Sequence, residues 1–219
     1  MLYILFGQDD FSLRHQLEEI KRGIGDQTLL AANTTTLDGQ QLKLDQLKTV
    51  CETVPFLAEM RLVVVNGLLE RFEPKTKSSR RKKIAPVANQ QNEYKSLAAY
   101  INKIPDSTIL VLIDGRIRSN NPLLRELSAQ AEVRSYPLLR EAKLRQWIGR
   151  RVTEAGGSLS PQAVSLLARL VGGNLWVMAN EIDKLVLFAS GRRIEEEDVK
   201  QVVSYAQEAN VFTMVDAIL

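Results

Sequence analysis

The fold is decided by the stretch Val54-Pro55-Phe56-Leu57-Ala58-Glu59-Met60-Arg61-Leu62-Val63-Val64-Val65, which is followed by Asn66-Gly67. Its second half, residues 62–65, is an unbroken run of apolar, mostly β-branched side chains. Such a run is typical of a strand that is buried on both faces of a parallel sheet. Its first half places large apolar side chains where a polar connection would ordinarily lead into the strand. The periodicity favours packing of this tip into the core, and the alternative is that the tip is offered to a partner.

Similar strands lie on both sides of this stretch. Residues 2–6 and 108–113 are almost wholly apolar, and two shorter strands are expected at 34–37 and 133–136. Apolar residues recur at helical spacing between them, which predicts helices near residues 13–24, 44–54, 93–103 and 122–127. Strands that alternate with helices predict an α/β fold, an open parallel sheet covered by helices.

From Leu139 onward only helices are expected. They begin near Leu144, Ser160-Pro161, Asn174 and Glu195, and a last one, capped by Asn210, runs to the end of the chain. Trp147 and Trp176 are both expected in the helical core. We therefore predict an α/β domain over 1–138, a small helical domain over 139–210, and the start of a truncated region over 211–219, after which the natural chain continues.

The composition restricts the class of protein. A net charge of +3, with 45% hydrophobic and 25% charged residues, is typical of a soluble globular protein and compatible with a nucleic-acid partner. Cys51 is the only cysteine, so no intrachain disulfide is available and a reducing cytoplasm is the expected compartment. No apolar run approaches the ~20 residues of a membrane span, and the N-terminus is predicted to be a strand, not a signal peptide.

No motif for catalysis is found. The first strand-to-helix turn, Gly7-Gln8-Asp9-Asp10-Phe11, has one glycine, no following lysine and two carboxylates, which argues against nucleotide binding. His15 and Cys51 lack partners at metal-ligand or triad spacing, and a lone Asp114 at a strand end is typical of a turn. The acidic run 195–198 fits a first helical turn. We expect no catalytic residue, cofactor or metal.

One basic segment could contact nucleic acid. Residues 75–83 contain no acidic side chain, but no aromatic side chain interleaves the charges either. A solvated loop is the favoured interpretation, and contact with DNA phosphates is the alternative. The candidate DNA contacts are Lys75, Lys77, Arg80, Arg81, Lys82 and Lys83.

Four motifs in order resemble a known family, the delta subunit of the bacterial DNA polymerase III clamp loader. They are Tyr3-Ile4-Leu5-Phe6-Gly7-Gln8-Asp9-Asp10-Phe11, Pro55-Phe56-Leu57 with 61–65, Gly173-Asn174-Leu175 with 180–185, and Asp198-Val199 with 210–218. The resemblance covers essentially the whole chain. It implies an AAA+-like α/β domain followed by a small all-α lid domain, with a helical collar domain beyond it.

The resemblance also implies that ATPase activity has been lost. Active clamp-loader ATPases have a P-loop in the first turn, acidic residues after the third strand, and an arginine in a Gly-x-x-Arg sequence of the lid. Here the first turn is Gly7 to Phe11, the third strand ends at Asn66, and Trp176 takes the place of the arginine.

The family binds and opens the sliding clamp with apolar residues that precede the third strand. This implies that the clamp is contacted at Pro55, Phe56 and Leu57, with either Pro55 or Leu57 as the second anchor beside Phe56, and with Met60 undecided between clamp contact and core. The implied partners are the sliding clamp (the beta subunit), the other clamp-loader subunits and primer–template DNA. Two alternatives remain, an ATP-binding AAA+ motor of the same fold and a stand-alone DNA-binding replication factor that uses the basic segment.

Overall fold

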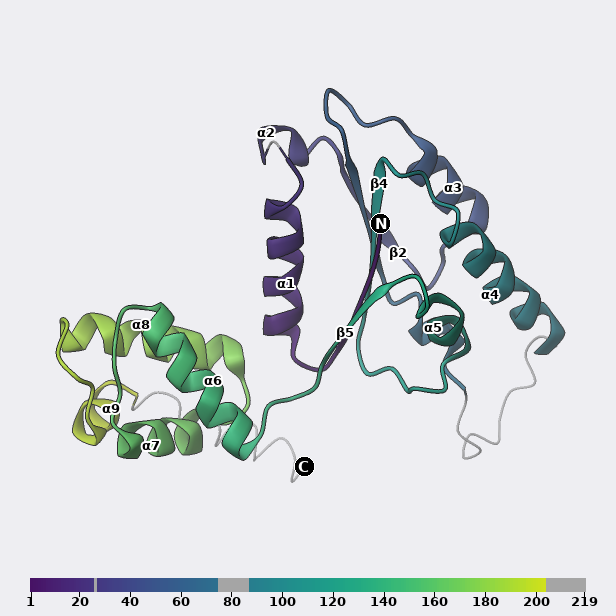
Figure 1. The fold of residues 1–219 in the computed structure, drawn as a ribbon. Coiled ribbons are helices and arrows are strands. Elements are labelled where there is room, and N and C mark those ends of the chain that lie inside the picture. The colour runs from purple at the N-terminus through teal and green to yellow at the C-terminus, as the bar shows by residue number, and fades with distance from the viewer. Residues whose placement is uncertain (26, 75–86, 204–219) are drawn as a thin grey trace. The chain divides into compact units, whose positions relative to one another are not determined.

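The computed structural model describes residues 1–25, 27–74 and 87–203, with the backbone alone for 87–91, and it divides into two compact units, 1–137 and 138–219. The first unit is built on a five-stranded sheet in the order β2-β3-β4-β1-β5, in which every neighbouring pair is parallel (Figure 1). The strands are β1 (Leu2–Gly7), β2 (Thr34–Asp38), β3 (Arg61–Asn66), β4 (Thr108–Asp114) and β5 (Glu132–Tyr136). The predicted open parallel α/β sheet is confirmed.

Helices cover both faces of this sheet. On one side lie α1 (Asp10–Arg22) and the short α2 (Gln27–Leu30), which the sequence did not predict (Figure 1). On the other side lie α3 (Leu44–Glu52), α4 (Val87–Ile101) and α5 (Pro122–Leu127), and a 3₁₀ turn, η1 (Glu70–Phe72), follows β3. Val54, predicted to continue the apolar face of α3, lies beyond the end of that helix and is exposed.

The stretch 62–65 is the centre of both cores. Leu62 and Val64 face the cluster that contains α1, whereas Val63 and Val65 face the cluster that contains α3, α4 and α5. All four side chains are buried, as the unbroken apolar run predicts. β5 differs from the buried run 62–65, because it lies at the edge of the sheet and Glu132 to Ser135 are exposed.

Among its described residues, the second unit consists of helices, apart from one isolated parallel bridge between Leu159 and Ile194. The helices are α6 (Glu141–Glu154), α7 (Pro161–Val171), α8 (Leu175–Ala189) and α9 (Glu196–Val202). Ser160 and Asn174 cap α7 and α8, because each side chain accepts a hydrogen bond from the backbone N–H three residues on. Trp147 is buried as predicted, but Trp176 is 47% exposed, so its placement in the core was wrong. The helix expected over 211–219 lies outside the described residues.

Asp114 fixes the turn after β3 to the end of β4. Its buried carboxylate accepts hydrogen bonds from the backbone N–H groups of Leu69, at 3.2 Å, and Glu70, at 2.9 Å. Burial raises the pKa of this carboxyl from 3.8 to about 7, and the negative charges of Glu70 and Glu73 act in the same direction, although the two N–H donors favour the charged form.

This pKa predicts a pH-dependent stability. The unfolded chain releases the Asp114 proton near its ordinary pKa of 3.8, whereas the folded chain holds it until about 7. The free energy of unfolding should therefore fall as the pH rises between these values, by at most about 1.4 kcal/mol per unit from this group. Asp114→Asn cannot ionise, so its urea midpoint should change less between pH 5 and pH 8 than the wild-type midpoint does.

Two other groups with shifted pKa values titrate outside the range between pH 4 and pH 7. The pKa of Asp198 is lowered to about 2 by its hydrogen bond to Arg192, and burial raises the pKa of Cys51 to about 11. An equal pH dependence in wild type and Asp114→Asn would show that Asp114 does not titrate between pH 5 and pH 8.

Candidate functional site

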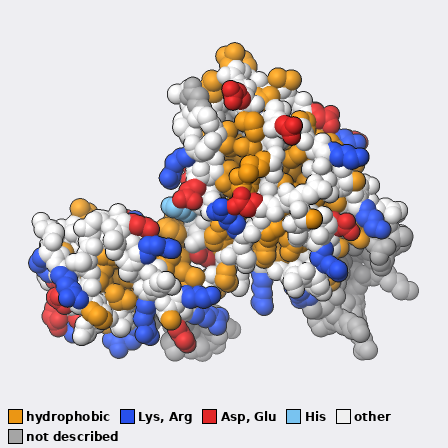
Figure 2. Space-filling view, in the orientation of Figure 1, with side chains coloured by type: hydrophobic (Ala, Val, Ile, Leu, Met, Phe, Trp, Pro, Cys, Tyr) orange, Lys and Arg blue, Asp and Glu red, His pale blue; other side chains and the backbone are white. Residues whose placement is uncertain are grey.

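The connection from α3 to β3, residues 54–60, presents apolar side chains to solvent; we call it the tip segment. Phe56 is 59% exposed and Leu57 is 76% exposed, and Val54 beside them is exposed as well. Figure 2 shows hydrophobic side chains at the end of the first unit where this connection lies. The core placement that periodicity favours is therefore wrong for Phe56 and Leu57. A cluster of large apolar side chains in water is typical of a binding surface.

Hydrogen bonds to Thr108, the first residue of β4, and to Ser107 just before it hold the chain on both sides of the tip segment. The buried Thr108 hydroxyl donates a hydrogen bond to the Cys51 carbonyl in the last turn of α3, at 2.7 Å. The Arg61 N–H donates to the Ser107 carbonyl at 2.8 Å where β3 begins. The tip segment is short and is held on both sides. Its apolar side chains are therefore exposed on a backbone with little conformational freedom.

Asn33, just before β2, holds the centre of the tip segment. Its side chain is 1% exposed; the amide oxygen accepts from the Phe56 N–H at 2.6 Å and the amide nitrogen donates to the Phe56 carbonyl at 2.9 Å. The same nitrogen donates to the Leu29 carbonyl at 3.0 Å. This two-way pairing fixes the backbone from which Phe56 projects. Sequence analysis missed it, because an asparagine before a strand is an ordinary turn residue.

Leu57 adopts an unusual backbone conformation. Its φ of 51° lies in the left-handed region, which costs a non-glycine residue roughly 1–2 kcal/mol. Its own side chain is mostly exposed, so burial does not offset this cost. Hydrogen bonds flank it on both sides, from Asn33 to Phe56 and from Arg61 to Ser107. Backbone strain of this kind is concentrated at ligand-binding sites.

A hollow of ≈ 560 Å³ lies beside the tip segment. Its lining is mostly apolar and comes mainly from the turn after α1, from α2 and from the tip segment, including Ile24, Leu29, Leu30, Leu57 and Met60. Met60 is partly buried and packs against the α1-side cluster. Pro55 is also partly buried. Of the predicted tip residues, Phe56 and Leu57 are therefore those that project furthest into solvent.

The turn where nucleotides bind in folds of this kind follows β1, at the carboxyl ends of the strands, whereas the tip segment precedes β3. The backbone N–H groups of Gly7 and Asp9 donate to the carbonyls of Gly115 and Tyr136, at 2.9 and 3.0 Å. The Asp9 carboxylate accepts from the Ser12 N–H at 3.1 Å and so lies at the N-terminus of α1. A Cβ on Gly7 would lie 2.0 Å from the Tyr136 carbonyl oxygen. Gly7 therefore permits the close packing of β1 against the Tyr136 backbone. A phosphate bound at the N-terminus of α1 would be repelled by the Asp9 carboxylate.

The remaining sequence candidates are dispersed. His15 is exposed on α1, and Cys51 is buried with a raised pKa, which disfavours the reactive thiolate. Asp198 caps α9 through the Glu195 N–H at 2.9 Å and pairs with Arg192. Over residues 1–25, 27–74 and 87–203, no group of three His, Cys, Asp or Glu side chains could hold a metal ion. The basic candidates Lys75 to Lys83 lie outside the described residues.

The fold and the tip segment together define a class of protein. Its first unit is a parallel α/β sheet with an exposed apolar tip, and the turn after β1, which binds phosphate in related folds, instead makes hydrogen bonds within the chain. A small helical unit follows. The family model "DNA polymerase III, delta subunit" matches residues 3–136. The chain belongs to this family, and the resemblance found in the sequence is confirmed.

Curated relatives and a solved structure agree with this assignment. The chain is 25% identical to DNA polymerase III subunit delta of Bacillus subtilis over 221 residues, which cover 100% of this chain and 61% of the relative. It is also 25% identical to the probable delta subunit of Aquifex aeolicus, with coverage of 100% and 59%. The Bacillus subtilis DNA clamp loader delta protein superposes with a TM-score of 0.71 at 24% identity, over 99% of this chain and 62% of that protein.

The superposition on the Bacillus subtilis protein shows that this chain shares the fold of that protein. The chain spans about three fifths of the length of the curated relatives that it matches. Among the described residues, no helix is long and apolar enough to cross a membrane.

Proposed function

We propose that this chain acts as a non-catalytic, cytoplasmic clamp-loader subunit of the bacterial DNA polymerase III holoenzyme. It binds the ring-shaped sliding clamp, the beta subunit, and opens it for loading on primer–template DNA together with the other clamp-loader subunits. The observation that carries this proposal is the tip segment, in which the buried Asn33 side chain holds an exposed Phe56–Leu57 pair. An aromatic and an aliphatic anchor on a rigid backbone form an efficient hot spot, because little conformational entropy is lost on binding.

The phosphate turn supports the absence of ATPase activity. Its backbone N–H groups donate to carbonyls within the chain, and the Asp9 carboxylate occupies the helix terminus at which an anion would bind. β3 ends at Asn66, which supplies no carboxylate for magnesium. The ATP-driven motor is therefore disfavoured. The DNA-binding alternative rests on residues 75–83, outside the described residues.

Opening of the clamp follows from differential affinity. A subunit that binds one distorted clamp interface more tightly than the closed interface shifts the ring toward the open state. The chain should therefore bind a monomeric clamp variant, whose ring interface is broken, more tightly than the closed ring.

Titration calorimetry with the sliding clamp of the same organism tests the proposal. We expect saturable binding to the clamp, a lower Kd for the monomeric clamp variant, and no binding of ATP. Absence of clamp binding by the folded chain would contradict the proposal, and saturable ATP binding would favour the motor.

A further inference from the structure

Basic side chains in the second unit fall into two groups. Most pair with carboxylates, for example Arg151 with Asp183 at 2.8 Å and Lys200 with Glu196 at 2.9 Å. Within the described residues 138–203, the basic side chains without an ion pair are Arg140, Lys143, Arg145 and Arg169. Uncompensated charge is therefore concentrated on α6, the residue before it, and α7.

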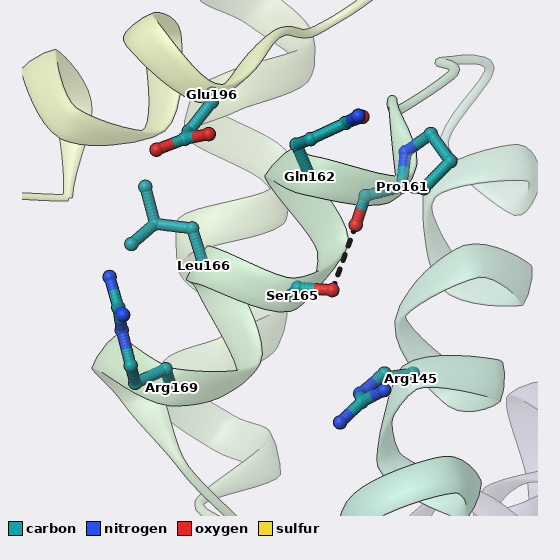
Figure 3. A pocket seen from close by; sticks show the side chains of 7 residues that line it. All are labelled: Arg145, Pro161, Gln162, Ser165, Leu166, Arg169 and Glu196. Atoms are coloured by element: carbon teal, nitrogen blue, oxygen red, sulfur yellow. Dashed lines mark hydrogen bonds between the residues drawn. The ribbon is translucent and has the colours of Figure 1, made fainter.

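Two of these arginines line one pocket. Arg145 of α6 and Arg169 of α7 lie on the wall of a hollow of ≈ 570 Å³, which we call the basic pocket, together with Gln162 and Ser165. Figure 3 shows the two guanidinium groups on either side of Ser165, on different helices. The Ser165 hydroxyl donates to the Pro161 carbonyl at 2.9 Å, so the arginines and Gln162 supply the side-chain donors that are free for a ligand.

The electrostatics of the basic pocket favour an anion. Its one acidic lining residue, Glu196, is paired with Lys200 at 2.9 Å and so offers little compensation. The 11-residue helix α7 begins at the pocket with Pro161, and its N-terminus adds partial positive charge. Two guanidinium groups without counter-charges repel each other, and an anion between them relieves that repulsion.

The residue types in the pocket narrow the class of anion. A guanidinium group binds phosphate oxygens with two parallel hydrogen bonds. None of the pocket's lining residues is aromatic, so nothing is provided on which a base could stack. We propose that the basic pocket binds phosphate groups of a nucleic-acid backbone, without reading the base sequence. This site is separate from the proposed clamp contact and does not depend on it.

A site-resolved titration tests the proposal. The full 219-residue chain, labelled with ¹⁵N, is titrated with a 20-nucleotide single-stranded DNA of mixed sequence at low salt. We expect the amide signals of Gln162, Ser165 and Arg169 to shift and saturate. Binding elsewhere on the chain leaves these signals in place, so unshifted signals at saturating DNA would overturn the proposal.

Two double variants that each remove two positive charges distinguish a discrete phosphate site from non-specific electrostatic attraction of DNA. Arg145→Ala with Arg169→Ala should abolish the shifts at Gln162 and Ser165 and lower the DNA affinity about tenfold. The double change should also reduce the salt dependence of log K by roughly 1.4, from two phosphate contacts with single strands. The control, Arg150→Ala with Arg193→Ala, removes two arginines whose carboxylate partners lie 3.7 and 3.8 Å away, and it should change the affinity less than twofold. Equal losses in both variants would contradict a discrete site.

Other phosphate sources are separated by two further probes. Inorganic phosphate and ATP are titrated in the same way. If either saturates the Gln162 and Ser165 shifts and the DNA does not, the nucleic-acid assignment is wrong. If the DNA shifts the Gln162 and Ser165 signals, and inorganic phosphate displaces the DNA only at millimolar concentrations in large excess over it, the nucleic-acid assignment stands.

Discussion

Replacement of Phe56 and Leu57 by alanine should weaken binding to the sliding clamp by ~2–4 kcal/mol, which is roughly 30- to 1,000-fold in Kd. Both side chains project from an anchored backbone, and neither is buried in the chain itself. Their truncation should therefore leave the urea midpoint nearly unchanged. The measurement is titration calorimetry of the double variant against the clamp, with unfolding followed in parallel.

The chain offers a closely matched control. Leu187-Phe188 on α8 is another adjacent leucine–phenylalanine pair, 81% and 44% exposed, against 76% for Leu57 and 59% for Phe56. Leu187→Ala with Phe188→Ala removes the same atoms from the second unit, and clamp affinity should stay within about twofold. Loss of binding in this control, with full affinity in the Phe56–Leu57 double variant, would move the contact to α8.

Asn33→Ala should reduce both stability and clamp affinity. The change leaves the N–H and carbonyl of Phe56 and the carbonyl of Leu29 without their side-chain partner. An unsatisfied, partly buried backbone group costs about 1–3 kcal/mol, so we expect a stability loss of roughly 2–3 kcal/mol. The affinity should fall as well, because the tip segment then has to be ordered on binding.

Asn33→Asp distinguishes the role of Asn33 in positioning the tip segment from its contribution to the stability of the fold. An aspartate keeps the acceptor for the Phe56 N–H, but it loses the donor to the two carbonyls and places a charge against them. Burial raises the pKa of such a carboxyl, and protonation supplies one O–H, which can donate to one of the two carbonyls. Clamp affinity of this variant should therefore rise relative to wild type as the pH falls from 7 to 5. The exposed Asn66→Asp serves as the control, and a wild-type pH profile in Asn33→Asp would argue against the positioning role.

The sheet could be predicted from the sequence because its signals are local. The apolar runs at 62–65 and 108–113 are buried on both faces, and the caps Asp9, Asn121 and Ser160 stand where helices begin. Each signal resides in a few consecutive residues and needs no knowledge of distant contacts.

The tip segment could not be predicted in the same way. Periodicity cannot tell an exposed apolar residue from a core residue, and it misplaced Val54, Phe56, Leu57 and Trp176 alike. The hydrogen bonds of Asn33 join residues 23 positions apart, so no local pattern reveals them. The role of Gly7 could not be predicted locally either, because its close approach to Tyr136 depends on the pairing of β1 with β5. The family resemblance, not the periodicity, predicts that Phe56 and Leu57 form a binding surface.

Hydrogen–deuterium exchange of the chain, with and without the sliding clamp, tests the clamp contact most directly. We expect slower exchange over residues 54–60 and over Asn33 when the clamp is bound, and unchanged exchange over residues 187–188. Unchanged exchange over 54–60 at saturating clamp, with slower exchange elsewhere on the chain, would contradict a clamp-binding role for the tip segment.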